Sequence, residues 1–259
     1  MVYQSLLWAK SPIKSHNERK VMKKLASITA FFPAFNDGGT ISSMVISALI
    51  ALPKVTEDYE VLIVNDGSED YTSDMLLELE RVYPQVRIIT HPINRGYGST
   101  LRTGFEAATK EWIFYTDGDA QYDPRELINL VMAVDTNTDI VNGYKISRKD
   151  PLHRILIGRL YHHIVRIMFG FQLRDVDCDF RLIKRKIFDE VELYSTSGTI
   201  CLEMVKKFQD AGYKFVEIPV HHFHRAYGKS QFFNFHRLFR TGIQLVILWW
   251  ALVVKKKER

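Results

Sequence analysis

Residues 112–121 of the chain, WIFYTDGDAQ, form an apolar and aromatic run that ends in two carboxylates, Asp117 and Asp119. This pattern predicts a buried strand that delivers paired acids to one edge of a sheet. Proteins usually hold Mg2+ with one or two carboxylates together with phosphate oxygens of a substrate. If the chain stays extended, Gln121 adds a neutral oxygen on the same side, so these three residues are a candidate Mg2+ or Mn2+ site. An ordinary Asp-Gly turn is the alternative for this stretch alone.

Apolar strands are also predicted earlier in the chain, over 28–32, 59–64 and 86–89, and the fourth strand covers 111–116. A helical pattern of apolar residues follows each of these strands. Alternating strands and helices of this size predict an α/β fold, in which a mostly parallel central sheet carries helices on both faces.

Two of the predicted helices have recognisable ends. The first has apolar residues at helical spacing over 41–49, and we expect Pro53 to end it. The helix after 111–116 is expected to begin with Asp123 as N-cap, Pro124 in the first turn and Glu126 as the acid at the third position.

Polar residues follow each predicted strand, at Asp37, Asp66, 94–95 and the acidic stretch 117–119. Ligands of parallel sheets bind beyond the carboxyl ends of the strands. Because these residues all fall at such ends, we expect four loops to converge on one crevice. This convergence favours a binding site over a set of unrelated surface turns.

At 259 residues the chain is long enough for one large domain, which we assign to 26–232, between a basic arm at 1–25 and a C-terminal segment at 233–259. The net charge is +5, and basic residues collect within 10–24 and 255–259. Such clusters favour an anionic surface, and an anionic bilayer attracts by about 1 kcal/mol for each nearby Lys or Arg. We do not expect a nucleic-acid partner, because no recognition-helix, zinc-finger or single-strand-binding signature accompanies the charge.

The most apolar run is 242–254, and three lysines follow it at 255–257. A span of the bilayer takes about 20 apolar residues, so this run is too short for an ordinary crossing. Two adjacent tryptophans beside a lysine cluster suit the headgroup boundary, and we expect monotopic or peripheral attachment at the cytoplasmic face of a membrane. A buried core helix or a contact between subunits of a homo-oligomer is the alternative. The basic and apolar segment 150–170 is equally suited to a bilayer surface and to packing on the sheet.

Three further features bear on the setting and the chemistry. Cys178 and Cys201 form no C-x-x-C pair and no signal peptide begins the chain, so we expect free thiols in a reducing, cytoplasmic setting. His222 and His224 share a strand face without an evident third ligand, which favours structural or phosphate-facing roles over a metal site. Glu203 is either a general base or a structural acid that supports Arg225 or the sugar, and we favour the structural role.

Six motifs occur in a fixed order between about residues 26 and 232. They are PAFND at 33–37, VNDGS at 64–68, NRGYG at 94–98, DGDAQ at 117–121, Asp175 with Phe180-Arg181, and RAYGKS at 225–230. In this order the chain resembles the family 2 glycosyltransferases with the GT-A nucleotide-sugar fold. Within them it is most similar to the dolichol- or polyprenyl-phosphate mannose synthases and their bacterial glucosyl relatives.

The resemblance implies an inverting, metal-dependent transfer of a hexose from a nucleoside-diphosphate sugar, of the GDP-mannose or UDP-glucose type, to a polyprenyl or dolichyl phosphate. It assigns the nucleoside to Pro33, Phe35, Asp37, Val64 and Asp66. It assigns the sugar diphosphate and the metal to Asp117, Gly118 and Asp119, with Gln121 as a further metal ligand, and the closing loop over the diphosphate to Arg225, Lys229 and Ser230. Lys145 would lie near the phosphates and Arg154 near the acceptor phosphate.

The chain departs from the family pattern at several positions. Asp37 replaces a Glu, Asn65 replaces an Asp, Lys145 replaces an Arg, Gln231 replaces a Lys and Gly158 replaces a Ser. A lysine cannot make the bidentate phosphate contact of an arginine, although Lys229 is close enough to take over the position of Gln231. Metal-dependent sugar transfer is compatible with these changes, whereas the exact donor and acceptor do not follow from the motifs.

A lipid phosphate is already anionic near neutral pH, because the second pKa of a phosphate monoester is about 6, so its attack needs no strong general base. In-line displacement then predicts inversion at the anomeric carbon. A hydroxyl acceptor on a glycolipid or polysaccharide would instead need a base such as Asp175, Asp177 or Glu203. A membrane scaffold that binds a nucleotide sugar without catalysis is the alternative outside enzymes.

Overall fold

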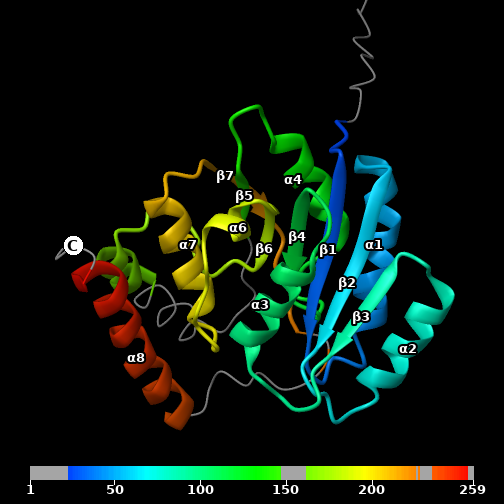
Figure 1. Ribbon diagram of the computed structural model, residues 1–259, viewed down its shortest axis with the longest axis horizontal. Helices are drawn as coiled ribbons and strands as arrows, with labels where there is room; N and C mark the ends of the chain where they lie inside the picture. The colour runs from blue at the N-terminus through cyan, green and yellow to red at the C-terminus, as the bar shows by residue number, and fades with distance from the viewer. Residues whose placement is uncertain (1–22, 147–161, 226, 228–234, 256–259) are drawn as a thin grey trace, which may run out of the picture.

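The computed structural model describes residues 23–146, 162–225, 227 and 235–255. Within them, seven strands form one mixed sheet in the order β3-β2-β1-β4-β6-β5-β7 (Figure 1). The strands are β1 (Ser27–Ala34), β2 (Asp58–Asn65), β3 (Val86–Thr90), β4 (Trp112–Thr116), β5 (Ile140–Lys145), β6 (Phe180–Lys184) and β7 (Phe215–Val220). Only β6 runs antiparallel to its two neighbours in this sheet. The predicted α/β fold with a mostly parallel sheet is confirmed.

Helices cover both faces of this sheet. They are α1 (Ile41–Val55), α2 (Thr72–Val82), α3 (Tyr97–Ala107), the 3-10 turn η1 (Pro124–Glu126), α4 (Leu127–Ala133), α6 (Ile187–Glu190), α7 (Ile200–Asp210), α8 (Phe235–Trp249) and the π-helical turn η2 (Trp250–Val254). Residues 162–169 are helical as well. Apolar side chains of α1, α2 and α4 join the core cluster on one face, and those of α3, α6 and α7 join the cluster on the other.

Strand β1 lies inside the sheet and is buried on both faces, which explains its nearly continuous apolar sequence. Ile28, Ala30 and Phe32 belong to one core cluster, and Phe31 belongs to the other. β1 pairs in parallel with β2 and β4, and β2 pairs in parallel with β3. The carboxyl ends of these four strands therefore meet at one edge of the sheet.

The ends of two helices test the sequence predictions. We expected Pro53 to end the first helix, and this is wrong, because α1 continues to Val55. A proline removes one helical hydrogen bond and crowds the preceding turn, but only the last turn is affected here, and the Thr56 amide still donates to the Leu52 carbonyl at 3.0 Å. The prediction at Asp123 is confirmed: its side chain accepts from the Arg125 amide at the start of η1 at 2.9 Å.

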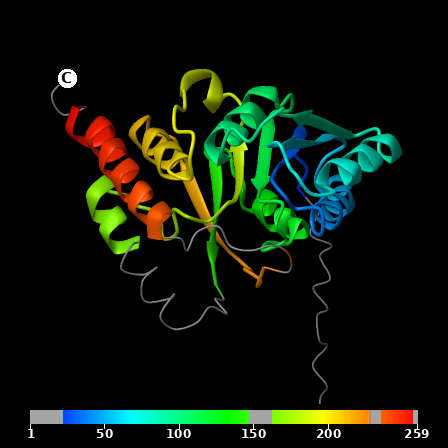
Figure 2. The same ribbon diagram turned by 90° about the horizontal axis from the view of Figure 1, so that it is seen from below.

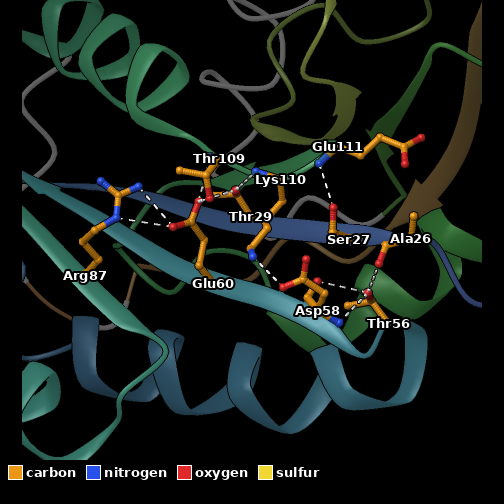
Figure 3. A network of polar contacts seen from close by, with 10 residues as sticks. All are labelled: Ala26, Ser27, Thr29, Thr56, Asp58, Glu60, Arg87, Thr109, Lys110 and Glu111. Carbon is orange, nitrogen blue, oxygen red and sulfur yellow. Dashed lines mark hydrogen bonds and ion pairs between the residues drawn. The ribbon is translucent and has the colours of Figure 1, made fainter.

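A polar network ties together the amino ends of the strands, opposite the edge where the loops converge (Figure 3). The Glu60 carboxylate accepts from the Thr29 hydroxyl at 2.7 Å, from the Thr109 amide at 2.8 Å and from the Arg87 guanidinium at 3.1 Å. Arg87 also donates to the Ala107 carbonyl at 2.7 Å. One side chain thereby links β1, β2, β3 and the segment that enters β4.

A third core cluster joins α7, α8 and the helical residues 162–169, which lie beside α8 in Figure 2. Leu245 of α8 is buried in it, and the Trp249 indole donates to the Met168 carbonyl at 2.8 Å. The opposite side of α8 and the start of η2 leave apolar side chains exposed, namely Ile243, Val246 and Ile247 of α8 and Trp250 of η2. The C-terminal run therefore packs on the protein with one face and presents an apolar surface with the other. Within the described residues, no helix combines the length and the apolar character that a bilayer crossing requires.

Residues 23–25, which we assigned to the N-terminal arm, are bonded to the domain. Lys24 pairs with Glu57 at 2.8 Å, and the Leu25 amide donates to the Val55 carbonyl at 2.8 Å. Residues 1–22 of the predicted arm lie outside the described part of the chain.

Candidate active site

The acidic stretch turns sharply after β4. Ala120 has a φ of 58°, in the left-handed region, and the Gln121 amide turns back to donate to the Asp119 carboxylate at 3.0 Å. Our expectation that the chain stays extended through Gln121 is therefore wrong. The Gln121 carboxamide instead donates to the Phe223 carbonyl at 3.3 Å, between the acidic turn and the segment that leads to Arg225.

The two acids of the turn have different partners. The Tyr97 hydroxyl donates to Asp117 Oδ1 at 2.7 Å, and Arg225 Nη2 donates to Asp119 Oδ2 at 2.6 Å. Burial raises the pKa of Asp117 well above its usual value, and the nearby carboxylates of Asp179 and Asp119 raise it further. Burial also raises the pKa of Asp119, while the Arg225 cation opposes that rise. The turn thus concentrates negative charge that one arginine offsets only in part.

The loop after β1 lies against this turn. The Thr40 hydroxyl donates to the Gly118 carbonyl at 2.8 Å, and Asp37 Oδ2 accepts from the Phe35 amide at 3.0 Å. Burial raises the pKa of Asp37 to about 6, and the Asp119 carboxylate adds to the rise. Phe35 is 38% exposed, which leaves its ring accessible beside the acids. The expected convergence of the loops after β1 and β4 is confirmed.

The loop after β2 is joined to the loop after β3 through Asp66. Its carboxylate accepts from the amides of Arg95 and Gly96, both at 2.9 Å, and contacts His91 Nδ1 at 2.7 Å. Both Asp66 and His91 are 4% exposed in their side chains. Asp66, predicted to hold the nucleoside, therefore has both carboxylate oxygens engaged inside the protein, where they fix the 95–96 turn.

Two other predicted nucleoside residues are buried. Val64 is fully buried and belongs to the same core cluster as Phe31 and Leu101. Its side chain is part of the core, which contradicts a contact of that side chain with a nucleoside and leaves only its backbone for such a role. Pro33 is paired with Val64 in the parallel ladder between β1 and β2 and is also buried.

Lys145, at the end of β5, faces a second acidic stretch. Its ammonium donates to the Asp177 carbonyl at 2.7 Å and lies 3.8 Å from the Asp175 carboxylate. Burial raises the pKa of Asp177 to about 6, and Lys145 opposes this rise. Lys145 thus joins the end of β5 to the 175–177 segment.

Asp179 is a residue of the site that was not predicted from the sequence. β6 runs antiparallel to β4 with Thr116 opposite Phe180, so Asp179 falls opposite Asp117 at the end of the strand pair. Asp179 Oδ1 accepts from the Tyr115 hydroxyl at 3.1 Å and contacts the Cys201 thiol at 3.1 Å. The only signal in the sequence was its position before the Phe180-Arg181 motif, because spacing alone does not reveal that this strand reverses direction.

A buried arginine, Arg181, joins the strands next to the acidic turn. Arg181 is 1% exposed, and its guanidinium donates to Asn142 Oδ1, the Tyr115 hydroxyl and the Val176 carbonyl. Buried guanidinium groups persist where their donors are satisfied in this way. Arg181 therefore links β4, β5, β6 and the 175–179 segment into one unit.

Glu203 has a structural role, but not the one that we expected. Its carboxylate accepts from the amides of Tyr194 at 3.0 Å and Ser195 at 2.8 Å and pairs with Lys207 at 2.7 Å. These partners lower its pKa in spite of its burial. Glu203 thus holds the 194–195 loop and does not contact Arg225, whose partner is Asp119.

The cysteines agree with their sequence prediction, whereas His222 and His224 follow the end of β7 at Val220 and do not lie on a strand, so the predicted shared strand face is wrong. His221 pairs with Glu126 at 2.9 Å, and the His222 ring meets the edge of Tyr122. Both Cys178 and Cys201 are buried free thiols. Arg154, Lys229 and Ser230, which we predicted to contact phosphates, lie outside the described residues, as do Gly158 and Gln231.

The donor set at the acidic turn fits a divalent cation. Asp117 and Asp119 offer oxygen ligands in a partly desolvated and negatively charged place, and one or two carboxylates with phosphate oxygens suffice for Mg2+. Among the described residues, no group of three or more His, Cys, Asp or Glu side chains forms a preassembled metal site. Phosphate oxygens of a substrate would add ligands to a cation held by these two carboxylates.

The sheet order, the acidic turn after β4 and the loops that converge on it define a GT-A fold of the kind used by nucleotide-sugar transferases. The sequence also matches a known protein family. The chain belongs to glycosyl transferase family 2, whose model, described as "Glycosyl transferase family 2", matches residues 29–192. The protein is accordingly a glycosyltransferase.

One relative and two solved structures of a second protein illustrate the similarity. The chain is 28% identical to an undecaprenyl-phosphate 4-deoxy-4-formamido-L-arabinose transferase of Enterobacter sp. (strain 638). The alignment spans 227 residues and covers 87% of this chain and 68% of the relative.

The fold of this chain resembles that of glucosyl-3-phosphoglycerate synthase from Mycobacterium tuberculosis in complex with Mn2+, uridine diphosphate and phosphoglyceric acid. The TM-score is 0.67, the identity is 15%, and the alignment covers 87% of this chain and 78% of the synthase chain. The same enzyme with Mn2+ and uridine-diphosphate-glucose gives a TM-score of 0.65, 16% identity, and coverage of 87% and 78%.

Proposed function

We propose that the protein transfers a sugar from a nucleoside-diphosphate sugar to a polyprenyl phosphate, with inversion and with the help of Mg2+ or Mn2+. The observation that carries this proposal is the turn after β4, where the half-buried Asp117 and the buried Asp119 lie beside Arg225 from a distant loop. The Enterobacter relative, which by its name acts on undecaprenyl phosphate, supports the acceptor class. The sugar of that relative is a substituted arabinose, so a hexose is one class of donor to be tested.

The nucleoside would bind in the loop after β1, where Phe35 is accessible beside Asp37. The diphosphate would lie between the acidic turn and Arg225, and Lys229 and Ser230 would close over it. In solved complexes of the M. tuberculosis synthase, uridine diphosphate is accompanied by Mn2+ or Mg2+. This supports a nucleotide and a cation in the same crevice here.

Asp117 and Asp119 would hold the cation, which as a Lewis acid offsets the charge that develops on the leaving diphosphate. The Gln121 carboxamide donates to the Phe223 carbonyl through Nε2, so its Oε1 would be the atom that contributes to the ligands. Arg225 lies 2.6 Å from Asp119 and is therefore within reach of the same diphosphate oxygens. A preorganised cation at developing charge typically contributes about 10²- to 10³-fold to turnover. Asp119 would thus position Arg225 until the diphosphate binds.

One phosphate oxygen of the lipid would attack the anomeric carbon as the bond from that carbon to the diphosphate breaks. The nucleotide sugar and the lipid phosphate each carry two negative charges before the reaction. Afterwards the nucleoside diphosphate carries three negative charges and the lipid phosphodiester carries one, so the charges balance without transfer of a proton. The second pKa of a phosphate monoester is about 6, which makes the acceptor anionic at neutral pH. In-line attack inverts the anomeric configuration.

A lipid acceptor requires the site to reach a membrane. The exposed apolar residues of α8 lie on a helix with no acidic residue, between exposed Arg240 and Lys255. Such a composition suits the interface of an anionic bilayer. We propose peripheral or monotopic attachment at the cytoplasmic face through α8 and the neighbouring helical residues 162–169. Exchange of Ile247 and Trp250 for Ser should release the protein from anionic vesicles, and unchanged co-sedimentation would contradict this attachment.

The function is tested by incubating the protein with polyprenyl phosphate and a panel of nucleotide sugars, and by weighing the lipid products with mass spectrometry. We expect one sugar to be transferred in a reaction that EDTA stops and that Mg2+ or Mn2+ restores. Asp119→Asn should abolish this turnover while circular dichroism and thermal unfolding stay close to those of the wild type. A retained anomeric configuration, or full turnover by Asp119→Asn, would refute the mechanism.

Transfer to a hydroxyl group is the second candidate, because Asp177 offers a carboxylate with a pKa of about 6 that could act as a general base. Glu203 is unsuited to this role since its carboxylate is engaged by two amides and by Lys207. Glycolipid acceptors in the same assay separate the two candidates. Transfer to a hydroxyl-bearing acceptor that Asp177→Asn eliminates would favour the second one.

A further inference from the structure

The Asn94–Gly98 motif provides the hydrogen bond to the first acid of the turn, because it contains Tyr97. We propose that Tyr97 is a positioning residue that sets the orientation of Asp117 for cation binding. This inference rests on the function proposed above. It adds a residue that does not itself touch the cation or the donor.

The contact is short and directional. The Tyr97 hydroxyl donates to Asp117 Oδ1 at 2.7 Å, which fixes the plane of the carboxylate while its other lone pairs stay available to a cation. Groups that hydrogen-bond a metal ligand fix its orientation, and their loss typically lowers metal affinity or activity about 10- to 100-fold. Asp119 takes a different partner, Arg225. The two acids of the turn are therefore oriented independently.

Tyr97 can fulfil this role because its backbone is held on one side by Asp66. The Asp66 carboxylate accepts from the amides of Arg95 and Gly96, and Gly96 has a φ of 91°, a conformation that favours glycine. His91 contacts Asp66 through Nδ1 at 2.7 Å and the Thr103 hydroxyl of α3 through Nε2 at 3.0 Å. The turn before Tyr97 is thereby anchored to a buried polar chain.

The other side of Tyr97 is held by the 195–197 loop. The Gly98 amide donates to the Thr196 carbonyl at 3.0 Å, and a Cβ atom at Gly98 would lie 2.4 Å from the Ser195 carbonyl oxygen. Glu203 holds this loop in turn through the amides of Tyr194 and Ser195. The contacts of Asp66 and those of the 195–197 loop therefore fix the backbone on both sides of Tyr97.

The test compares Tyr97→Phe with the wild type. The variant keeps the ring and removes only the hydroxyl that donates to Asp117. Mn2+ is titrated into the protein with UDP and, in parallel, with GDP, and free Mn2+ is followed by electron paramagnetic resonance. We expect Mn2+ to bind about 10- to 100-fold more weakly, and excess Mn2+ to restore most of the turnover without a change in KM for the acceptor.

Tyr213→Phe is the matched control, because its hydroxyl donates to the Glu190 carboxylate at 2.6 Å on an exposed part of the surface. We expect its Mn2+ affinity to equal that of the wild type, and thermal unfolding verifies that both variants fold. If Tyr97→Phe binds Mn2+ within twofold of the wild type, the role of Tyr97 is overturned while metal-dependent transfer by the wild type still stands. If the wild type binds no Mn2+ with either nucleotide and transfers sugar without metal, the proposed function fails first and the role of Tyr97 fails with it.

Discussion

Arg225 Nη2 lies 2.6 Å from Asp119 Oδ2, so a cation from the segment after β7 pairs with an acid from the turn after β4. The Asp119 side chain is 7% exposed and that of Arg225 is 31% exposed, which leaves the arginine accessible from the crevice. A metal ion and Arg225 would compete for the same carboxylate, whereas a bound diphosphate would give Arg225 a new partner. We infer that this pair would link donor binding to the release of the Asp119 carboxylate for a metal ion.

Exchange of Arg225 should lower turnover and at the same time raise the affinity for a metal ion. In Arg225→Ala we expect turnover to fall about 100-fold, because a cation at the developing diphosphate charge is lost. The affinity of the nucleotide-free protein for Mn2+ should rise, because the competing guanidinium is absent from Asp119. Steady-state kinetics and Mn2+ titration measure these quantities. Turnover near that of the wild type would show that Arg225 does not act on the leaving group.

Arg181→Met should destabilise the protein by about 3 kcal/mol, because Asn142, Tyr115 and Val176 each lose a buried hydrogen-bond donor. The free energy of unfolding in urea measures this loss. Arg185→Met is the matched control: its pair with Asp189 is exposed and should contribute less than about 0.5 kcal/mol. Equal stabilities of the two variants would contradict the role of Arg181 as a structural link.

Glu60→Gln should weaken the protein in a pH-dependent manner. Hydrogen bonds from Thr109 and Thr29 and the charge of Arg87 lower the pKa of Glu60 below 4.5 in spite of its burial. A lowered pKa in the folded state stabilises the protein above the unfolded pKa, and this contribution is lost as the pH falls through the folded value. We expect a difference from the wild type of about 2 kcal/mol at pH 7 that shrinks below pH 4.5.

Urea unfolding of wild type and Glu60→Gln across this pH range measures the difference. Glu57→Gln provides the control, because Glu57 is 85% exposed and pairs with Lys24 at the surface. We expect no measurable pH dependence from that exchange. A difference between wild type and Glu60→Gln that stays constant from pH 7 to pH 3 would contradict the predicted role of the carboxylate charge.

The two thiols should resist modification in the folded protein. Burial raises the pKa of Cys178 to about 12 and that of Cys201 well above its usual value, and the thiolate is the reactive form. At pH 8 we expect an aromatic disulfide reagent to modify neither cysteine at a measurable rate until guanidinium is added, after which two equivalents react. Rapid reaction of either thiol in the folded protein would show that its surroundings open to solvent.

The Asp177→Asn variant distinguishes the two acceptor classes, because a lipid phosphate with a second pKa of about 6 would also lose its second charge below pH 6. If Asp177 acts as a general base, activity requires its ionised form and falls as the pH drops below about 6, and Asp177→Asn loses activity at all pH values. With a lipid phosphate acceptor, we expect Asp177→Asn to retain most of its turnover at pH 7.5. Initial rates between pH 5 and 9 decide between these outcomes, provided that acceptor ionisation is followed separately by phosphorus NMR.

Much of the site could be predicted from the sequence because it depends on local patterns. The strand before Asp117, the N-cap at Asp123 and the convergence of loops at the carboxyl ends of parallel strands all follow from the order of residues. The position of Gln121 could not be predicted, because the chain turns back at Ala120 in the left-handed conformation. A glycine usually marks such a conformation in a sequence, and this position holds an alanine. Asp179 could not be predicted either, since it faces Asp117 only because β6 runs antiparallel to β4.

The α/β class, the acidic turn and the family follow from the order of residues alone, since strand and helix periodicity and a set of ordered motifs are local properties of the chain. Which side chains meet depends on the folded domain: Arg225 meets Asp119, Tyr97 meets Asp117, and Asp66 meets His91 and the turn that it holds. These pairs are separated by 106, 20 and 25 positions in the chain. Contacts over such separations depend on sheet order and strand direction, which the packing of the whole domain selects.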